Sequence, residues 1–119
     1  MIFNDNKITI MELEYDYWTG AYNNVLESLK RSVGQYIRNN EKVKIGVTND
    51  PERRSREHSQ SPLNWDKMIV KYKTTSVNFV NKLEIDLVDY NWDFVENERG
   101  GGGGPAGDGD QYLYVLLKY

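Results

Sequence analysis

The stretch that decides the fold is KVKIGVTNDPERRSREH, residues 42–58. Its first seven residues, 42–48, alternate between apolar side chains and lysine, glycine or threonine, which predicts a short strand. Asp50 and Pro51 then predict the start of a helix, because aspartate caps free backbone amides and proline loses no hydrogen bond at the first helical position. We expect this helix to end at about Ser59. A strand that leads directly into a capped helix therefore lies in the middle of the chain.

Outward from this unit, hydrophobic periodicity predicts further elements on both sides. The expected strands are 7–18, 68–74 and 111–119, and the expected helices are 22–39 and 77–91, the second capped by Ser76. In 68–74 we expect Met68, Val70 and Tyr72 on one side of the strand, with lysines between them. Five consecutive glycines fall within 99–110, which predicts a flexible loop. The pattern predicts one α+β domain over 1–119, with a small, mainly antiparallel sheet flanked by helices.

The composition excludes several kinds of site. The chain has 119 residues, no cysteine and one histidine, His58, which excludes disulfide scaffolds, thiolate zinc sites and two-histidine mechanisms. Acidic residues among the first twenty positions argue against a secretory signal, and no apolar stretch approaches the roughly 18–20 residues that span a bilayer. We therefore expect a soluble protein of the cytoplasm with no membrane partner.

Charge is unevenly distributed along the chain. The net charge is −3, yet residues 30–73 hold eleven Lys and Arg against five Asp and Glu, a local charge of +6. A basic central segment can form a phosphate-facing surface within an acidic protein. The alternative is that these charges simply solvate helix faces.

Three groups of side chains in and beyond this segment are candidates for chemistry. Arg54 and His58 are four residues apart on the helix after 42–48, so they face the same way. On the 77–91 helix, Glu84 falls inside the arc formed by Phe79, Val80, Leu83, Leu87 and Val88. A carboxylate there requires a partner, a metal ion or a proton. Asn97 follows this helix, where it can reach back over the sheet.

Together these residues resemble the GIY-YIG endonuclease superfamily. In that family YIG-x-T precedes an arginine, ten residues after the first motif position, and a histidine four residues later. The matching positions here are Lys44, Ile45, Gly46, Thr48, Arg54 and His58. The family then has a strand, a helix with one metal-binding glutamate, and an asparagine. These are matched by KMIVKYKTT, by VNKLEIDLVDY with Glu84, and by Asn97, so the resemblance covers about residues 42–97.

The resemblance implies a metal-dependent endonuclease that hydrolyses phosphodiester bonds, with one Mg²⁺ or Mn²⁺ ion held by Glu84. It implies that Arg54 contacts the scissile phosphate, that a tyrosine deprotonates the attacking water, and that Asn97 completes the site. His58 and Lys44 would assist proton transfer or bind phosphate. The basic segment then becomes the face for nucleic acid, with DNA as the expected partner. Its expected contacts are Arg53, Arg56, Lys71 and Lys73.

Two departures from the family pattern concern tyrosines. Lys44 stands where the motif has its leading tyrosine. The strand that carries the other tyrosine does not directly precede 42–48, where the 22–39 helix stands instead. It can be supplied by MELEYDYW, with Tyr15 or Tyr17, or by QYLYVLLKY, with Tyr112 or Tyr114. We favour the second, which makes the domain circularly permuted, because it avoids a crossover helix between strands that the family pairs antiparallel.

Two other functions are alternatives. A catalytically inactive domain of this type, which binds nucleic acid or inhibits a nucleic-acid enzyme, agrees with the small size, the acidic pI and Lys44. A structural or assembly protein would require that the KIG motif is coincidental. A protein partner and a homodimer both stay open.

Overall fold

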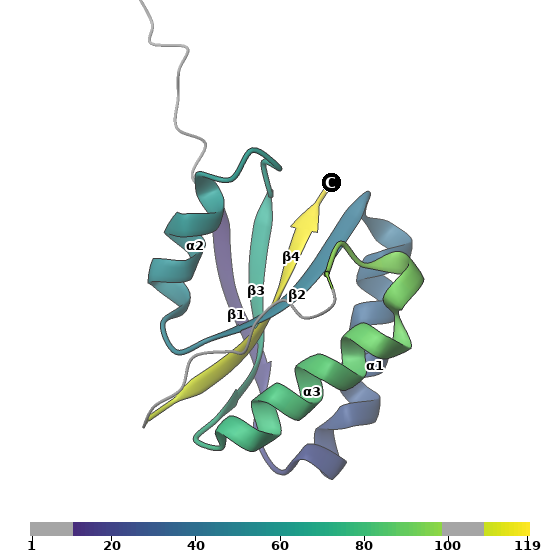
Figure 1. The fold of residues 1–119 in the computed structure, drawn as a ribbon, viewed down its shortest axis with the longest axis vertical. Helices are drawn as coiled ribbons and strands as arrows, with labels where there is room; N and C mark the ends of the chain where they lie inside the picture. The colour runs from purple at the N-terminus through teal and green to yellow at the C-terminus, as the bar shows by residue number, and fades with distance from the viewer. Residues whose placement is uncertain (1–10, 99–108) are drawn as a thin grey trace, which may run out of the picture.

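The computed structural model describes residues 11–98 and 109–119, which form a four-stranded sheet with helices on both faces (Figure 1). The strands are β1 (Glu12–Trp18), β2 (Lys42–Thr48), β3 (Lys67–Thr74) and β4 (Gln111–Lys118). The helices are α1 (Tyr22–Asn39), α2 (Pro51–Ser59) and α3 (Val77–Tyr90), followed by the short 3-10 helix η1 (Trp92–Phe94). This α+β architecture is the one expected from the sequence.

The strand order in the sheet is β1-β3-β4-β2. β4 lies between β2 and β3 and is antiparallel to both, whereas β1 is parallel to β3 at the far edge. The C-terminal strand is therefore the neighbour of the KIG strand, as favoured above, and two strands separate β1 from β2. The register places Tyr114 directly opposite Gly46.

The two faces of the sheet have separate cores. α1 and α3 lie side by side on one face, and α2 lies on the other (Figure 1). Successive residues of a strand point to opposite faces. Val115 of β4 accordingly belongs to the larger core, with Leu29 and Leu83 from the two helices. Tyr114 belongs to a smaller cluster on the α2 side, with Met11, Trp65, Met68 and Leu116.

Local sequence explains where two of the helices begin. The Asp50 side chain accepts a hydrogen bond from the backbone N–H of Arg53 at 3.1 Å, and the Ser76 hydroxyl accepts one from Phe79 at 3.1 Å. Such caps satisfy amides that the first turn of a helix leaves without a partner. The expected starts of α2 and α3 are therefore confirmed.

The expected one-sided pattern of β3 is wrong. An irregularity between Val70 and Tyr72 shifts the register against β4. Met68 consequently packs on the α2 side of the sheet, whereas Ile69 and Tyr72 both belong to the core under α1 and α3. A shift of one residue moves every later side chain to the opposite face of a strand.

The buried arc of α3 is narrower than expected. Its fully buried residues are Val80, Leu83 and Leu87. Phe79, expected within the arc, is 38% exposed. Glu84 lies at the border of the arc and is half-buried.

Two expectations fall on residues outside the described ranges: the first residues of the 7–18 strand, and most of the glycine-rich loop predicted at 99–110. Over 11–98 and 109–119, no helix has the length and apolar character required to cross a membrane.

Candidate active site

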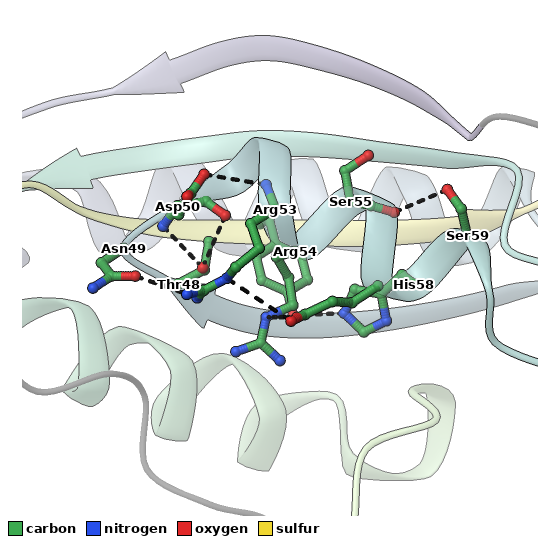
Figure 2. A network of polar contacts seen from close by, with 10 residues as sticks. Thr48, Asn49, Asp50, Arg53, Arg54, Ser55, His58 and Ser59 are labelled. Carbon is green, nitrogen blue, oxygen red and sulfur yellow. Dashed lines mark hydrogen bonds and ion pairs between the residues drawn. The ribbon is translucent and has the colours of Figure 1, made fainter.

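The turn between β2 and α2 positions two of the candidate residues (Figure 2). Thr48 Oγ1 accepts a hydrogen bond from the backbone N–H of Asp50 at 3.0 Å, and it donates one to the Asp50 carbonyl oxygen at 3.3 Å. Asp50 in turn caps α2. Because these bonds fix where α2 begins, they also fix the direction in which Arg54 and His58 leave the helix.

Tyr114 contacts His58 at the centre of the site. The tyrosine is 4% exposed, and Nε2 of His58 lies 2.9 Å from its hydroxyl oxygen in a hydrogen bond. Gly46 makes room for this ring, because a Cβ atom at Gly46 would overlap with the Oη and Cζ atoms of Tyr114. The glycine of KIG is therefore explained by the close approach of a side chain from the neighbouring strand.

Burial and neighbouring cations keep His58 uncharged at neutral pH. Desolvation, followed by the charges of Lys44 and Arg54, lowers the pKa of His58 to about 4. Burial raises the pKa of Tyr114 to about 12, which the Arg54 charge opposes and the Glu84 charge reinforces. The pair at the centre of the site is thus a neutral imidazole hydrogen-bonded to a neutral phenol.

Arg54 brings positive charge that α2 only partly neutralises. Its Nε atom lies 3.4 Å from Oε1 of Glu57, without the alignment of a hydrogen bond. The same carboxylate is shared with Arg53, whose Nε lies 3.8 Å from Oε2. One carboxylate therefore faces two guanidinium groups, which leaves a net positive charge to attract an anion. Figure 2 shows both arginines on the same stretch of α2 as His58.

Glu84 reaches the same neighbourhood from α3. Desolvation raises its pKa to about 7, and the charge of Lys44 on β2 opposes this shift. The charge of Glu84 also raises the pKa of Tyr114, and that of Lys44 lowers the pKa of His58. Because charge interactions fade with distance and screening, these three pairwise effects indicate that Glu84 and Lys44 lie in the neighbourhood of the hydrogen-bonded Tyr114–His58 pair. Within the described chain, Glu84 has no hydrogen bond or ion pair to compensate its burial.

Five of the residues expected from the sequence therefore come together from four elements, β2, α2, α3 and β4. We call them the Tyr114 cluster, which consists of Lys44, Arg54, His58, Glu84 and Tyr114.

Asn81 is a neighbour of this cluster that the sequence analysis misses. It lies three residues before Glu84 on α3, so the two side chains are adjacent on one helix face. Its Oδ1 atom is buried and accepts no hydrogen bond from the residues that the structure describes. The motif residues matched in the sequence do not include this position, and its spacing to Glu84 is the signal in the sequence that points to it.

Asn97 lies against β2, but its polar atoms are already engaged. Its Oδ1 accepts a hydrogen bond from the backbone N–H of Ile45 at 2.9 Å, and its Nδ2 donates to the Ile45 carbonyl at 2.7 Å. The backbone N–H of Glu96 donates to the Val43 carbonyl at 2.8 Å. One backbone hydrogen bond from Glu96 and two from the Asn97 side chain therefore attach residues 96–97 to the outer edge of β2. Asn97 positions the KIG strand from this place.

Of the tyrosines considered, only Tyr114 contacts the histidine. Tyr112 faces the same side of β4, but it is paired with Lys73 in the sheet and raises the pKa of that lysine. Tyr15 and Tyr17 are exposed on β1, at the edge of the sheet remote from β2. Of the candidate tyrosines on β1 and β4, Tyr114 is therefore the one that is placed to act with His58.

The residues expected to contact nucleic acid have different environments. Arg53 and Arg56 are exposed on α2. Lys71, by contrast, is 4% exposed, and its Nζ lies 3.2 Å from an Asp16 carboxylate oxygen. Contrary to expectation, Lys71 is not accessible to a phosphate, because it lies on the same sheet face as Ile69, with its Nζ 5.6 Å from the centroid of the Tyr36 ring of α1. Lys73 is half-buried on the same strand.

The donor atoms of the Tyr114 cluster suit a cation with few protein ligands. No three His, Asp or Glu side chains lie together in 11–98 and 109–119, and Glu84 is the one carboxylate of the Tyr114 cluster. Mg²⁺ is commonly held by one or two carboxylates, with waters and phosphate oxygens completing the shell. The desolvated Glu84 carboxylate and the unbonded Oδ1 of Asn81 fit such an ion.

Comparison with known proteins adds no family to this description. No protein-family model matches the sequence, and the curated proteins and solved structures compared with it yield no match. The resemblance to the GIY-YIG superfamily stays a prediction that depends on the motif residues.

Proposed function

We propose that this chain is a metal-dependent endonuclease that hydrolyses phosphodiester bonds in DNA. The observation that carries the proposal is the Tyr114 cluster, in which a phenol is hydrogen-bonded to a neutral imidazole beside an arginine, a lysine and a desolvated carboxylate. Phosphodiester hydrolysis requires such groups, because the attacking water must lose a proton while negative charge develops on the phosphate oxygens.

Tyr114 and His58 together provide a route for the proton of the attacking water. With a pKa of about 12, Tyr114 is not a phenolate at neutral pH, so it does not act as a preformed base. In the tautomer that carries its proton on Nδ1, Nε2 of His58 instead accepts the phenol proton as the Tyr114 oxygen takes one from water. The oxygen of that water then forms the new bond to phosphorus as the bond to the leaving oxygen breaks. The leaving oxygen keeps the bonding electron pair and takes a proton from solvent, and His58 releases its proton to solvent.

Substrate binding would strengthen His58 as a proton acceptor. Lys44 and Arg54 are the two cations that lower its pKa. A phosphate bound between them neutralises their charge, which raises the pKa of His58 from its low value in the free protein. His58 is therefore a weak base until a phosphate is bound. Proton transfer to His58 is favoured only in the complex of the protein with its substrate.

Glu84, with Asn81 beside it, would hold one Mg²⁺ ion. Such an ion, when bound, supplies positive charge to the phosphate and to the leaving oxygen. Arg54 contacts the same phosphate through its planar guanidinium group, which is suited to two parallel hydrogen bonds.

The test is nicking of supercoiled plasmid DNA by the purified chain in Mg²⁺, in Mn²⁺ and in EDTA. We expect nicking in either metal, none in EDTA, and loss on the order of 100-fold or more in Glu84→Gln and Arg54→Gln. Lys118→Gln is the control for a lost cation, because this lysine is outside the Tyr114 cluster and its Nζ donates a hydrogen bond to the Asn64 carbonyl at 3.3 Å. It should nick as well as wild type.

Failure of the wild-type chain to nick plasmid or to cut oligonucleotide DNA or RNA in either metal would overturn the proposal. Binding of DNA without cleavage would favour the inactive nucleic-acid-binding domain instead. Equal nicking by wild type and Glu84→Gln would show that the activity comes from another protein in the preparation or from another site.

A further inference from the structure

A groove of about 550 Å³ lies on the face of the molecule that α1 and α3 cover. These helices pack side by side on the side of the sheet away from α2 (Figure 1). The residues that give the groove its character are Lys30, Arg31, Gly34 and Arg38 from α1, with Tyr90 and Phe94 from the end of α3 and η1. No member of the Tyr114 cluster lines it. Its volume lies within the range of sites that hold small ligands.

Two aromatic rings stand exposed at this groove. Tyr90 and Phe94 are each 65% exposed, although burial of either ring would stabilise the fold. The Nζ of Lys30 lies 4.5 Å from the centroid of the Tyr90 ring. Exposed rings interleaved with cations are the arrangement on which nucleic-acid bases stack.

Two of the three cations that line the groove are not neutralised. Neither Arg31 nor Arg38 has a carboxylate partner among the described residues, and Arg31 donates one hydrogen bond to Ser28 at 3.4 Å. Lys30 is paired with Glu27, also in the lining, at 3.4 Å. The groove is therefore positive in a chain whose net charge is −3. Two free guanidinium groups suit a phosphate, which each can bind through parallel hydrogen bonds.

Gly34 gives the groove its open floor. Glycine inside a helix costs roughly 0.5–1 kcal/mol relative to alanine. Packing does not require it here, because the nearest atom to a Cβ at Gly34 would be Nη1 of Arg38 at 3.4 Å, the end of a flexible side chain. No close packing contact therefore accounts for this glycine, and the missing side chain leaves the groove open at this position.

We propose that this groove binds one unpaired nucleotide, with its base stacked on Phe94 and Tyr90 and its phosphate held by Arg31 and Arg38. The nucleotide has two sources, a single-stranded nucleic acid or a free nucleoside monophosphate. Both share the flat base and the adjacent anion that the groove matches. Binding here involves no catalytic group, so it stands or falls separately from the proposed nuclease activity.

The binding experiment is done in EDTA, where no cleavage takes place. Fluorescence anisotropy of a short labelled oligothymidylate measures binding of a single strand. Calorimetry measures binding of AMP and, separately, of its parts, adenosine and inorganic phosphate. We expect the strand or AMP to bind, and to bind more tightly than adenosine or phosphate alone. If the strand binds more tightly per nucleotide than AMP does, the ligand is a nucleic acid. If the two affinities per nucleotide are equal, the ligand is the free nucleotide.

Matched variants assign the binding to the groove. Phe94→Leu with Tyr90→Leu should weaken binding about tenfold or more, whereas Phe79→Leu, another partly exposed aromatic of α3, should not. Arg31→Gln with Arg38→Gln should weaken binding and reduce the magnitude of its salt slope for the strand by about 1.4, whereas Lys118→Gln should leave the slope within error.

Gly34 provides a test that does not weaken the helix. Gly34→Leu should fill the groove and abolish binding, and Gly34→Ala, which adds only a methyl group beside Arg38, should weaken binding less. Leucine and alanine are both better helix formers than glycine, so neither effect reflects a weakened helix. The proposal is overturned if neither ligand binds, if phosphate alone or polyglutamate binds as tightly, or if Gly34→Leu and the aromatic double variant bind as wild type does.

Discussion

The Tyr114 ring lies across Gly46, its antiparallel partner on β2, and its hydroxyl group reaches His58 on α2. This one relationship connects three elements that are distant in the sequence. The missing side chain at Gly46 is what lets the phenol cross the edge strand, so the KIG motif and the C-terminal strand form one structural unit. The catalytic proposal depends on this unit, because it places the only histidine of the chain against a tyrosine.

Gly46→Ala should therefore displace Tyr114. The added methyl group would overlap with the Oη and Cζ atoms, so we expect a loss of about 1–3 kcal/mol in the free energy of unfolding, together with loss of nicking activity. Urea unfolding followed by circular dichroism measures the first. Gly34→Ala is the matched control, since it should raise the free energy of unfolding by about 0.5–1 kcal/mol. Equal effects of the two substitutions would contradict the role of Gly46.

Tyr114→Phe separates the hydroxyl group from the ring. It keeps the packing but removes the acceptor for the water proton, so the nicking rate should fall on the order of 100-fold or more while the fold is retained. Tyr112→Phe is the control on the same face of the same strand, outside the Tyr114 cluster, and should nick at the wild-type rate. If Tyr112→Phe lost the nicking activity and Tyr114→Phe kept it, Tyr112 would be the residue that accepts the water proton, and the assignment of Tyr114 would be wrong.

The sequence predicts local structure where one residue type sets one conformation. Asp50 before Pro51 predicts the start of α2, and Ser76 before Val77 predicts the start of α3. Hydrophobic periodicity predicts α1 and β4. Spacing alone also indicates that Arg54 and His58 share a helix face. These features depend on neighbours within a few residues, which the sequence shows directly.

Features that depend on register are beyond such local reasoning. Tyr112 and Tyr114 share a face of β4, and only the pairing with β2 decides which one reaches the histidine. The alternation in β3 predicts an accessible Lys71, yet Lys71 shares a sheet face with the core residue Ile69 and is buried. Asn97 has the expected place in the chain, but its hydrogen bonds to the Ile45 backbone become visible only in the fold.

Glu84 should make the folded state less stable as the pH rises. Its pKa is raised from 4.5 to about 7, so its contribution is fully present below pH 4.5 and is lost as the pH rises through 7. Glu84→Gln removes this dependence. The variant should match wild type at low pH and exceed it above neutrality by about 1–2 kcal/mol, after allowance for solvent screening of a half-buried group. Urea unfolding across this range measures the difference, and a variant less stable than wild type above neutrality would contradict the assignment.

Mg²⁺ should stabilise the folded chain through the same carboxylate. A ligand that binds only the folded state raises its stability, and the ionised form of Glu84 is the one that binds. We expect Mg²⁺ to raise the Tm of wild type at about pH 8, to raise it little at about pH 5, where Glu84 is protonated, and to leave Glu84→Gln unchanged. An equal rise in Tm for wild type and variant would place the cation elsewhere.

The measurement that tests the central claim most directly is an NMR titration of His58. The claim is that groups from β2, α2, α3 and β4 share one site, and the single histidine gives one resolved ring signal. We predict a midpoint at about pH 4 in wild type, and a higher midpoint in Lys44→Met and in Arg54→Met, because each loses a cation that lowers the pKa of His58. A wild-type midpoint near 6.5, or a midpoint that neither substitution changes, would contradict the claim.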